Sequence, residues 1–206
     1  MEIIFASKNN HKVREIKEMI QESFDFPVLS LSVDPKYVQP EETGSTFEEN
    51  ALIKARDAHK HFKDSIVLAD DSGLVVPSLK GQPGVYSARY AGENKSDAKN
   101  REKLLKEMKD LTGSQRQAYF QCVIVMILPD GEELFFNGIS EGSILTQEKG
   151  CNGFGYDALF IKHDYDKSFA ELNENVKNKI SHRRKALNLA LLHLEKKHKN
   201  LLSKIS

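Results

Sequence analysis

The sequence alternates short apolar runs with amphipathic helical segments, and this order constrains the fold more than any other feature. Residues 2–6 (EIIFA) form an apolar run typical of a buried strand, and a polar stretch (SKNNHK) follows it. Apolar side chains then recur at helical spacing, at Val13, Ile16, Met19 and Ile20. Strand, polar turn and helix in this order predict an α/β unit.

Later segments repeat this order and add a hairpin. Alternating residues 28–33 (VLSLSV) predict a second strand, and an apolar run over residues 65–69 predicts a third that ends at Asp70. Residues 117–128 are the longest strand candidate, and Pro129-Asp130-Gly131 turns it into a hairpin. Because helices alternate with strands while a hairpin is also present, the sequence predicts an α/β fold with a mixed β-sheet flanked by helices.

Two helix starts carry capping signals. The spacing of Ser45 and Glu48 predicts a capping box, because the hydroxyl and the carboxylate can satisfy exposed N–H groups reciprocally. The apolar face of the helix that follows consists of Phe47, Ala51, Ala55, Ala58 and Phe62. Ser96 predicts the N-cap of a further helix. The final helix has an apolar face made of Leu187, Ala190, Leu191 and Leu194.

Composition argues against several classes of protein. The chain has 206 residues, with 30 Lys and Arg against 30 Asp and Glu, so its formal net charge is zero. This balance argues against a protein that holds nucleic acid by bulk charge. No apolar run approaches the ~20 residues that span a bilayer, and the N-terminus lacks the layout of a signal peptide. Because the 2 cysteines are also too few for a disulfide framework, we expect a cytoplasmic protein without a nucleic-acid or membrane partner.

A polar cluster joins the first predicted strand to the first predicted helix. It consists of Ser7, Lys8, Asn9, Asn10, His11 and Lys12. Free N–H groups at a helix start, together with Ser, Asn and Lys side chains, can hold a phosphate. The cluster is not a P-loop, because the glycines and the Gly-Lys-Ser/Thr ending are missing. A plain polar turn between strand and helix is the alternative.

Two acidic clusters, Glu41-Glu42 and Asp70-Asp71, are candidates for a metal site. The second directly follows a predicted buried strand, where carboxylate charge is costly without a cation or another partner. Mg²⁺ suits such a site, because it takes one or two carboxylates together with waters and substrate phosphates. The alternative is that these acids serve only as turn formers.

A fourth cluster combines an aromatic side chain with glycines and basic residues. Phe154 lies between two glycines in GFGYD (153–157), and Lys177 and the stretch SHRRKAL (181–187) follow. A ring flanked by glycines can expose a face on which a base stacks. His and Arg side chains can donate to a base oxygen. The alternative places Phe154 in the core and the Arg pair in solvent.

Together these clusters resemble the inosine triphosphate pyrophosphatase family. The matching stretches are Ser7-x-Asn9-x-x-Lys12, EETGSTFEENALIKA (41–55), LADDSGL (68–74), GVYSARYAG (84–92), GFGYD (153–157) and SHRRKAL (181–187). They run from the first strand to the last helix, and several motifs in one order make the resemblance specific. The chain departs from the family at Ala158, where proline is expected, and at Lys8, where glycine is frequent.

The resemblance implies hydrolysis of a nucleoside triphosphate to the monophosphate and pyrophosphate, with Mg²⁺ as cofactor. It also implies a homodimer and a single domain over residues 1–206, with two lobes around a central substrate cleft. The cluster Ser7–Lys12 would hold the triphosphate, chiefly through Ser7, Asn9 and Lys12. Glu42 and Asp71 would bind the metal, and Asp71 would also be the catalytic base toward water.

The other residues that the resemblance implies would contact the substrate and its base. Ser72 would contact the substrate, and Phe154 would stack on the base. The residues predicted to line the base and sugar end are Gly155, Tyr156, Asp157, Lys177, His182 and Arg183. Hypoxanthine and xanthine carry an oxygen at position 6, to which the N–H groups of His182 and Arg183 would donate. Adenine has an amino group there, which would face these donors without forming a hydrogen bond. The expected substrates are therefore ITP, dITP and XTP, whose incorporation into DNA and RNA the enzyme would prevent.

Other functions stay open at this point. A related pyrophosphatase with a different base preference would share these motifs. A nucleotide-binding sensor without turnover is disfavoured, because carboxylates beside a triphosphate repel it unless a metal intervenes. Nucleic-acid binding by the basic C-terminal helix ranks lowest, because that helix has an apolar face for the core.

Overall fold

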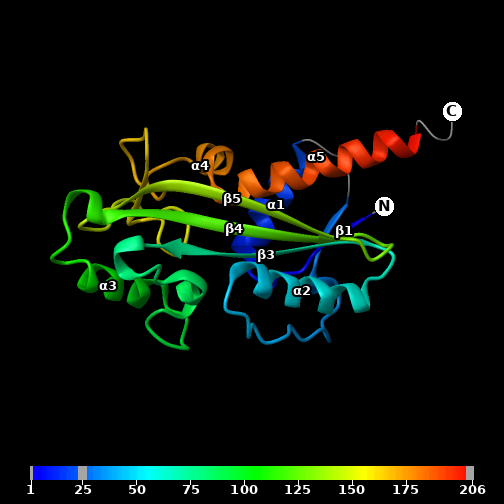
Figure 1. Ribbon diagram of the computed structural model, residues 1–206, viewed down its shortest axis with the longest axis horizontal. Coiled ribbons are helices and arrows are strands. Elements are labelled where there is room, and N and C mark those ends of the chain that lie inside the picture. The colour runs from blue at the N-terminus through cyan, green and yellow to red at the C-terminus, as the bar shows by residue number, and fades with distance from the viewer. Residues whose placement is uncertain (1, 23–26, 203–206) are drawn as a thin grey trace. The chain divides into compact units, whose positions relative to one another are not determined.

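Six strands form one mixed β-sheet in the order β2-β1-β3-β4-β5-β6 (Figure 1). The computed structural model describes residues 2–22 and 27–202. The strands are β1 (Ile3–Phe5), β2 (Val28–Ser30), β3 (Ile66–Val75), β4 (Gln117–Ile127), β5 (Glu133–Ile144) and β6 (Phe160–Lys162). The helices are α1 (Asn10–Gln21), α2 (Phe47–His61), α3 (Asp97–Glu107), α4 (Glu174–Ile180) and α5 (His182–Leu202). Because β1 is parallel to β2 and β3 while β5 is antiparallel to β6, the predicted mixed sheet is confirmed.

The chain divides into two compact units, each assembled from segments that are distant in the sequence. Unit 1 comprises Met1–Asp71, Val123–Gly138 and Arg183–Ser206, and unit 2 comprises Ser72–Cys122 and Ile139–His182. The strands β3, β4 and β5 each begin in one unit and end in the other. The single two-lobed domain expected from the resemblance stays a prediction.

In unit 1, both faces of the parallel strands are buried. One face forms a cluster of Ile4, Ala6, Val67 and Ala69 with the α2 residues Ala51, Ala55 and Ala58. The opposite face carries the buried residues Ile3, Phe5, Ile66 and Leu68. Figure 1 shows α2 and α5 on opposite sides of these strands. Strands covered on both faces read as continuous apolar runs, as residues 2–6 and 65–69 do.

In unit 2, aromatic rings form the centre of the core. The centroid of Phe120 lies 4.8 Å from that of Phe160, and Phe160 lies 4.9 Å from Phe169. Leu104 and Met108, at the end of α3, belong to the same buried cluster. These side chains pack α3 against the core, and the Ser96 hydroxyl accepts from the Lys99 N–H, which confirms the predicted cap.

Several predicted boundaries are confirmed and others are wrong. The strands β4 and β5 are neighbours joined by a turn at Gly131, which confirms the hairpin. The strand predicted over 28–33 ends at Ser30, because the Ser30 hydroxyl caps a short 3₁₀-helix over Leu31–Val33. The cap of α2 is Thr46 and not Ser45: the Thr46 hydroxyl accepts from the Glu49 N–H at 3.1 Å. No described helix, in residues 2–22 or 27–202, is long and apolar enough to cross a membrane.

Candidate active site

The first predicted cluster lies where β1 passes into α1, in unit 1. Asn9 caps the helix, because its Oδ1 accepts from the N–H groups of His11 at 3.0 Å and of Lys12 at 3.3 Å. The Ser7 hydroxyl accepts from the Asn9 N–H at 3.1 Å. Asn10 and His11 lie exposed in the first turn of α1. Ser7 and Asn9 therefore shape the polar turn and present the exposed start of a helix, where an anion binds favourably.

Lys8, at the position where the family often has glycine, points toward another segment of unit 1. Its ammonium donates to the backbone carbonyl of Tyr37. The Tyr37 hydroxyl in turn donates to Asp57 at 2.5 Å, and burial together with the Asp57 carboxylate raises the pKa of Tyr37. Lys8 thus ties the polar turn to the segment that precedes α2.

Asp70 is a buried carboxylate held by two cations. Lys12 Nζ lies 3.0 Å from Asp70 Oδ2, and Arg183 Nη2 lies 3.1 Å from the same oxygen. Arg183 also binds Glu15 through Nη1. Burial by itself raises the pKa of Asp70, but Lys12 and Arg183 outweigh it and hold that pKa below its ordinary value. Asp70 is therefore an ionised anchor for Lys12, and the base contact expected of Arg183 stays a prediction.

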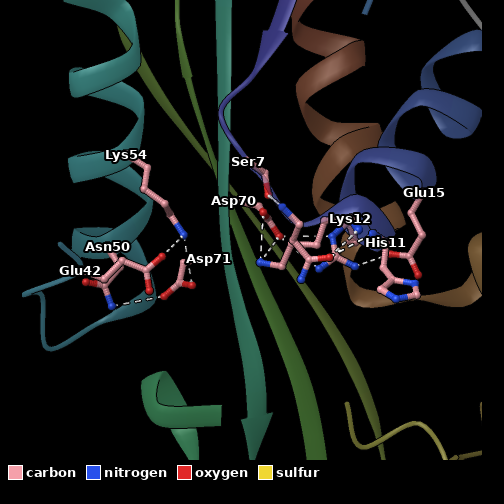
Figure 2. A network of polar contacts seen from close by, with 11 residues as sticks. Ser7, His11, Lys12, Glu15, Glu42, Asn50, Lys54, Asp70 and Asp71 are labelled. Atoms are coloured by element: carbon pink, nitrogen blue, oxygen red, sulfur yellow. Dashed lines mark hydrogen bonds and ion pairs between the residues drawn. The ribbon is translucent and has the colours of Figure 1, made fainter. Parts of the chain in front are cut away.

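Asp71 faces a different set of partners, which α2 supplies (Figure 2). Lys54 Nζ lies 2.7 Å from Glu42 Oε1 and 3.4 Å from Asp71 Oδ1. Asn50 Nδ2 donates to Asp71 Oδ2 at 3.3 Å. One ammonium thus joins the two carboxylates that the sequence predicts as metal ligands.

The side chains of Asp70 and Asp71 lie on opposite faces of β3. The expected strand end at Asp70 is wrong, because β3 continues to Val75 and both aspartates lie inside it. Successive side chains of a strand point to opposite faces. Figure 2 shows the result: Asp70 points toward Lys12, whereas Asp71 points toward Lys54. Each carboxylate is tolerated within a buried strand because the helix on its own side supplies a cation.

Burial and charge act in opposite directions on the Lys54 cluster. Burial lowers the pKa of Lys54, but Asp71, Asp70 and Glu42 outweigh it and raise that pKa above its ordinary value. Burial raises the pKa of Asp71, and Lys54 opposes this only in part. Lys54 is therefore firmly cationic, while Asp71 holds a proton more readily than an exposed aspartate does.

Glu42 and Asp71 fit a magnesium ion by the chemistry of their donor atoms. Both are carboxylates, and both contact the same ammonium. Within the described ranges 2–22 and 27–202, no group of three or more His, Cys, Asp and Glu side chains could hold a metal by itself. Magnesium takes as few as one or two carboxylates and completes its shell with waters and substrate phosphates. These two residues therefore fit a metal that arrives with a nucleotide.

In unit 2, predicted base-binding residues surround Phe154. Lys177 Nζ binds the buried Asp157 Oδ2 at 2.7 Å and lies 4.7 Å from the centroid of the Phe154 ring. The same Asp157 oxygen accepts from the Phe154 N–H at 2.9 Å. Gly153 has a φ of +74°, and a Cβ there would lie 2.1 Å from that oxygen, so this turn requires glycine. Asp157 and Lys177 therefore hold the half-buried Phe154 in place.

The helix α3 holds Gly155, the residue after Phe154, from both sides. Asp97 Oδ2 accepts from the Gly155 N–H at 2.7 Å, and Arg101 Nη1 donates to the Gly155 carbonyl at 2.9 Å. Arg101 Nε also lies 2.9 Å from Glu148. Because Asp97 and Arg101 are four residues apart, they share one face of α3. That face fixes the backbone of the loop that carries Phe154.

The remaining predicted substrate residues of unit 2 lie as follows. Tyr156 is buried, and its hydroxyl donates to the carbonyl of Ser87 at 2.9 Å. His182 is buried and stacks on Phe120, with ring centroids 4.8 Å apart. Ser72 is half-buried on β3. Their contacts with substrate stay predictions.

Comparison with known proteins identifies the family. Residues 3–192 match the model of the Ham1 family. The chain belongs to the Ham1 family. It is 53% identical over 187 residues to a relative from Protochlamydia amoebophila, strain UWE25, named dITP/XTP pyrophosphatase, with 90% of this chain and 94% of that protein covered. A relative of the same name from Clostridium perfringens is 49% identical over 189 residues, covering 89% and 92% of the two chains.

Solved structures agree with this assignment to the Ham1 family. The Staphylococcus aureus Ham1 protein has a TM-score of 0.84 and 46% identity, covering 96% of this chain and 100% of that one. A HAM1 protein from Coxiella burnetii has a TM-score of 0.85 and 39% identity, with 95% and 99% covered. The family resemblance read from the sequence and the α/β fold are therefore confirmed.

Sequence reasoning missed several residues that hold the site of this Ham1-family chain. The sequence motifs assign no role to Lys54 and Asn50, although their spacing of four residues places both on one face of α2. A polar pair that flanks the buried Ala51 and Ala55 is the signal that would have found them. Glu15 has no comparable signal, because only the folded chain brings it to Arg183.

Proposed function

We propose that this chain is a nucleoside-triphosphate pyrophosphatase that hydrolyses ITP, dITP and XTP to the monophosphate and pyrophosphate. Membership of the Ham1 family and the close relatives named dITP/XTP pyrophosphatase support this function. The structural observation that carries it is the joining of Glu42 and Asp71 through the ammonium of Lys54. In the cell, this activity would keep purine nucleotides with altered bases out of DNA and RNA.

Unit 1 supplies the groups for the triphosphate end. In this proposal pyrophosphate is the leaving group, so water attacks the α-phosphorus and negative charge moves to the pyrophosphate. Lys12, anchored by Asp70, and the exposed start of α1 offset that charge. Asp71 accepts the proton of the attacking water as general base. Lys54 holds Asp71 and Glu42 together for this step.

Mg²⁺ is the cofactor in this proposal, with Glu42 and Asp71 as its protein ligands. When bound, the metal neutralises phosphate charge and lowers the pKa of a bound water. The chemistry of the two carboxylates supports this assignment, since phosphates and waters complete the shell of a magnesium ion. The two-lobed domain with a central substrate cleft belongs to the same proposal.

Unit 2 supplies the groups for the base. The ring of Phe154 stacks on it, and the Lys177 ammonium beside that ring supplies donors. A ring N–H of His182 is a further donor. Position 6 of hypoxanthine and xanthine is an acceptor, whereas adenine has a donor there, so a site lined by donors disfavours ATP. Asp157 keeps Lys177 and Phe154 in place through its ion pair and its bond to the Phe154 N–H.

A substrate panel tests this function. ITP, dITP, XTP, GTP and ATP are incubated with the protein and Mg²⁺, and pyrophosphate and orthophosphate are measured separately. We expect pyrophosphate from ITP, dITP and XTP at rates far above those for ATP and GTP. Equal rates on ATP, or release of orthophosphate alone, contradict the proposal. Nucleotide binding without turnover identifies a sensor in place of an enzyme.

A homodimer in the cytoplasm completes the proposal. Light scattering coupled to size-exclusion chromatography measures the mass of the assembly against the 23.3 kDa of one chain. Cell fractionation followed by the ITP assay locates the activity. A monomeric mass, or activity confined to a membrane fraction, contradicts this part of the proposal alone.

A further inference from the structure

Asn50 is a fully buried amide that binds two separate parts of the proposed metal site. Its exposed fraction is 0%. Its Oδ1 accepts from the Gly44 N–H at 2.8 Å, and its Nδ2 donates to Asp71 Oδ2 at 3.3 Å. Gly44 lies two residues after Glu42 in the loop before α2. One side chain therefore connects the Glu42 loop with the Asp71 carboxylate, and Figure 2 shows its bond to Asp71.

The partners of Asn50 leave its amide only one orientation. The backbone N–H of Gly44 is a donor, so the amide oxygen must face it. The NH₂ group then faces Asp71, whose Oδ2 accepts from it. Reversal of the amide would set two donors against each other and two acceptors against each other, leaving buried polar groups unsatisfied. Asn50 thus fixes the loop and the carboxylate at the same time.

The loop approaches Asn50 so closely that only glycine fits at position 44. A Cβ on Gly44 would lie 2.6 Å from the Cβ of Glu49 and 2.7 Å from Asn50 Oδ1. The contact with Glu49 cannot be relieved by a side-chain rotation, because its Cβ is attached to the α2 backbone, and the backbone N of Asn50 would also lie only 3.0 Å away. Gly44 and Asn50 are therefore the two ends of one link between loop and helix.

We propose that Asn50 is a positioning residue that sets the placement of Glu42 relative to Asp71 for metal binding. It acts through Gly44 on the loop that carries Glu42, and directly on Asp71. Lys54 attracts both carboxylates, but a single ammonium on a flexible stem does not define their orientation. The planar amide supplies that orientation. This inference rests on the proposed function, because Glu42 and Asp71 are ligands only if a metal binds there.

Asn100 in unit 2 is a matched control. It is 2% exposed, its Oδ1 accepts from the Ala91 N–H at 2.7 Å, and its Nδ2 donates to the Ala88 carbonyl at 3.1 Å. Both asparagines therefore lie on a helix, accept from the N–H of a backbone segment outside it and donate one further hydrogen bond. They differ in that only Asn50 donates to a proposed metal ligand. Loss of either amide removes comparable structural contacts.

The test compares Asn50→Ala with Asn100→Ala by titrating the nucleotide-free protein with Mn²⁺ and following free Mn²⁺ by electron paramagnetic resonance. We expect Asn50→Ala to raise the Mn²⁺ dissociation constant at least about tenfold, as loss of groups that orient metal ligands typically does. The Mg²⁺ concentration for half-maximal ITP hydrolysis rises in parallel. Asn100→Ala leaves both quantities close to those of the unsubstituted chain. Thermal unfolding shows that each variant is folded.

Gly44→Ala breaks the same link from its other end and leaves the side chains of Asn50, Glu42 and Asp71 unchanged. We expect it to weaken Mn²⁺ binding as Asn50→Ala does. Because both substitutions break the same link, we expect the double variant to lose no more Mn²⁺ affinity than the single variant that binds Mn²⁺ more weakly. Gly44→Ala also decides the matter if Asn50→Ala does not fold.

The outcomes separate this inference from the proposed function. If the unsubstituted chain binds Mn²⁺ and hydrolyses ITP while Asn50→Ala keeps its Mn²⁺ affinity, the positioning role is overturned and the function stands. Equal losses in Asn50→Ala and Asn100→Ala, or additive losses in the Gly44–Asn50 double variant, also overturn it. If the unsubstituted chain neither binds Mn²⁺ nor hydrolyses ITP, the metal site itself fails, and the inference falls with it.

Discussion

Replacement of Arg183 by methionine tests whether this residue serves the structure or the substrate. The Arg183 side chain is 2% exposed and lies among the largest fully buried side chains. Its Nε and Nη2 atoms lie 3.2 Å and 3.1 Å from Asp70 Oδ2, and its Nη1 binds Glu15. Methionine keeps most of the volume but removes the cation. The substitution therefore isolates the role of the charge.

The geometry sets the magnitude of the loss. Two unit charges 3.1 Å apart attract by roughly 5 kcal/mol at an effective dielectric constant of about 20, and desolvation offsets much of this. Removal of one partner from a buried ion pair costs about 3–5 kcal/mol, because the other charge stays buried. Lys12 remains 3.0 Å from Asp70, so we expect the lower end, about 3 kcal/mol. For a chain of this size that corresponds to a decrease of about 6–12 °C in Tm.

Thermal unfolding followed by circular dichroism measures this decrease, and two further variants act as controls. Glu15→Leu with Arg183→Met replaces the pair by apolar side chains and should recover much of the lost Tm, because such replacements are often neutral. Arg184→Met removes a cation whose partner, Glu22, is 54% exposed, so its effect should be smaller. A Tm of Arg183→Met within about 2 °C of the unsubstituted chain, together with a raised KM for ITP, refutes the structural role.

Four further predictions concern the site. Asp71→Asn lowers kcat for ITP by about two to four orders of magnitude, because the general base is lost, and retained turnover contradicts this role. Phe154→Ala raises KM for ITP by roughly 5- to 100-fold through loss of stacking; an unchanged KM with a large loss of Tm places Phe154 in the core instead. EDTA abolishes hydrolysis and added Mg²⁺ restores it; activity that persists in EDTA contradicts the metal assignment. Arg101→Met removes the donor to the Gly155 carbonyl and the ion pair with Glu148, so we expect KM for ITP to rise while kcat changes less. An unchanged KM would show that this contact does not hold the loop that carries Phe154.

The course of β3 shows where sequence reasoning reached its limit. The apolar run over residues 65–69 correctly predicts a buried strand. Its expected end at Asp70 is wrong, because β3 continues through both aspartates to Val75. Two carboxylates argue against a buried strand unless cations lie beside them. Those cations come from α1, α2 and α5, and no local pattern shows that they lie there.

The residues around Asp71 also show what the sequence does not predict. The acidic motifs predict Glu42 and Asp71 as metal ligands, but no motif assigns a role to Lys54 or Asn50. On a helix seen alone, these two residues read as polar positions beside an alanine face. In the folded chain both are buried, and they bind the two predicted metal ligands.

The sequence was sufficient to identify the family and most of the strands and helices, although it did not predict α4. The family and these elements follow from local signals, because hydrophobic periodicity and motif spacing depend on residues that are near one another in the chain. The pairing of buried charges, in contrast, emerges only from the folded chain. Alternation along β3 turns Asp70 toward Lys12 and Arg183, and Asp71 toward α2. Such pairing depends on segments that meet only when strands and helices pack, because buried charge is tolerated only beside its partner.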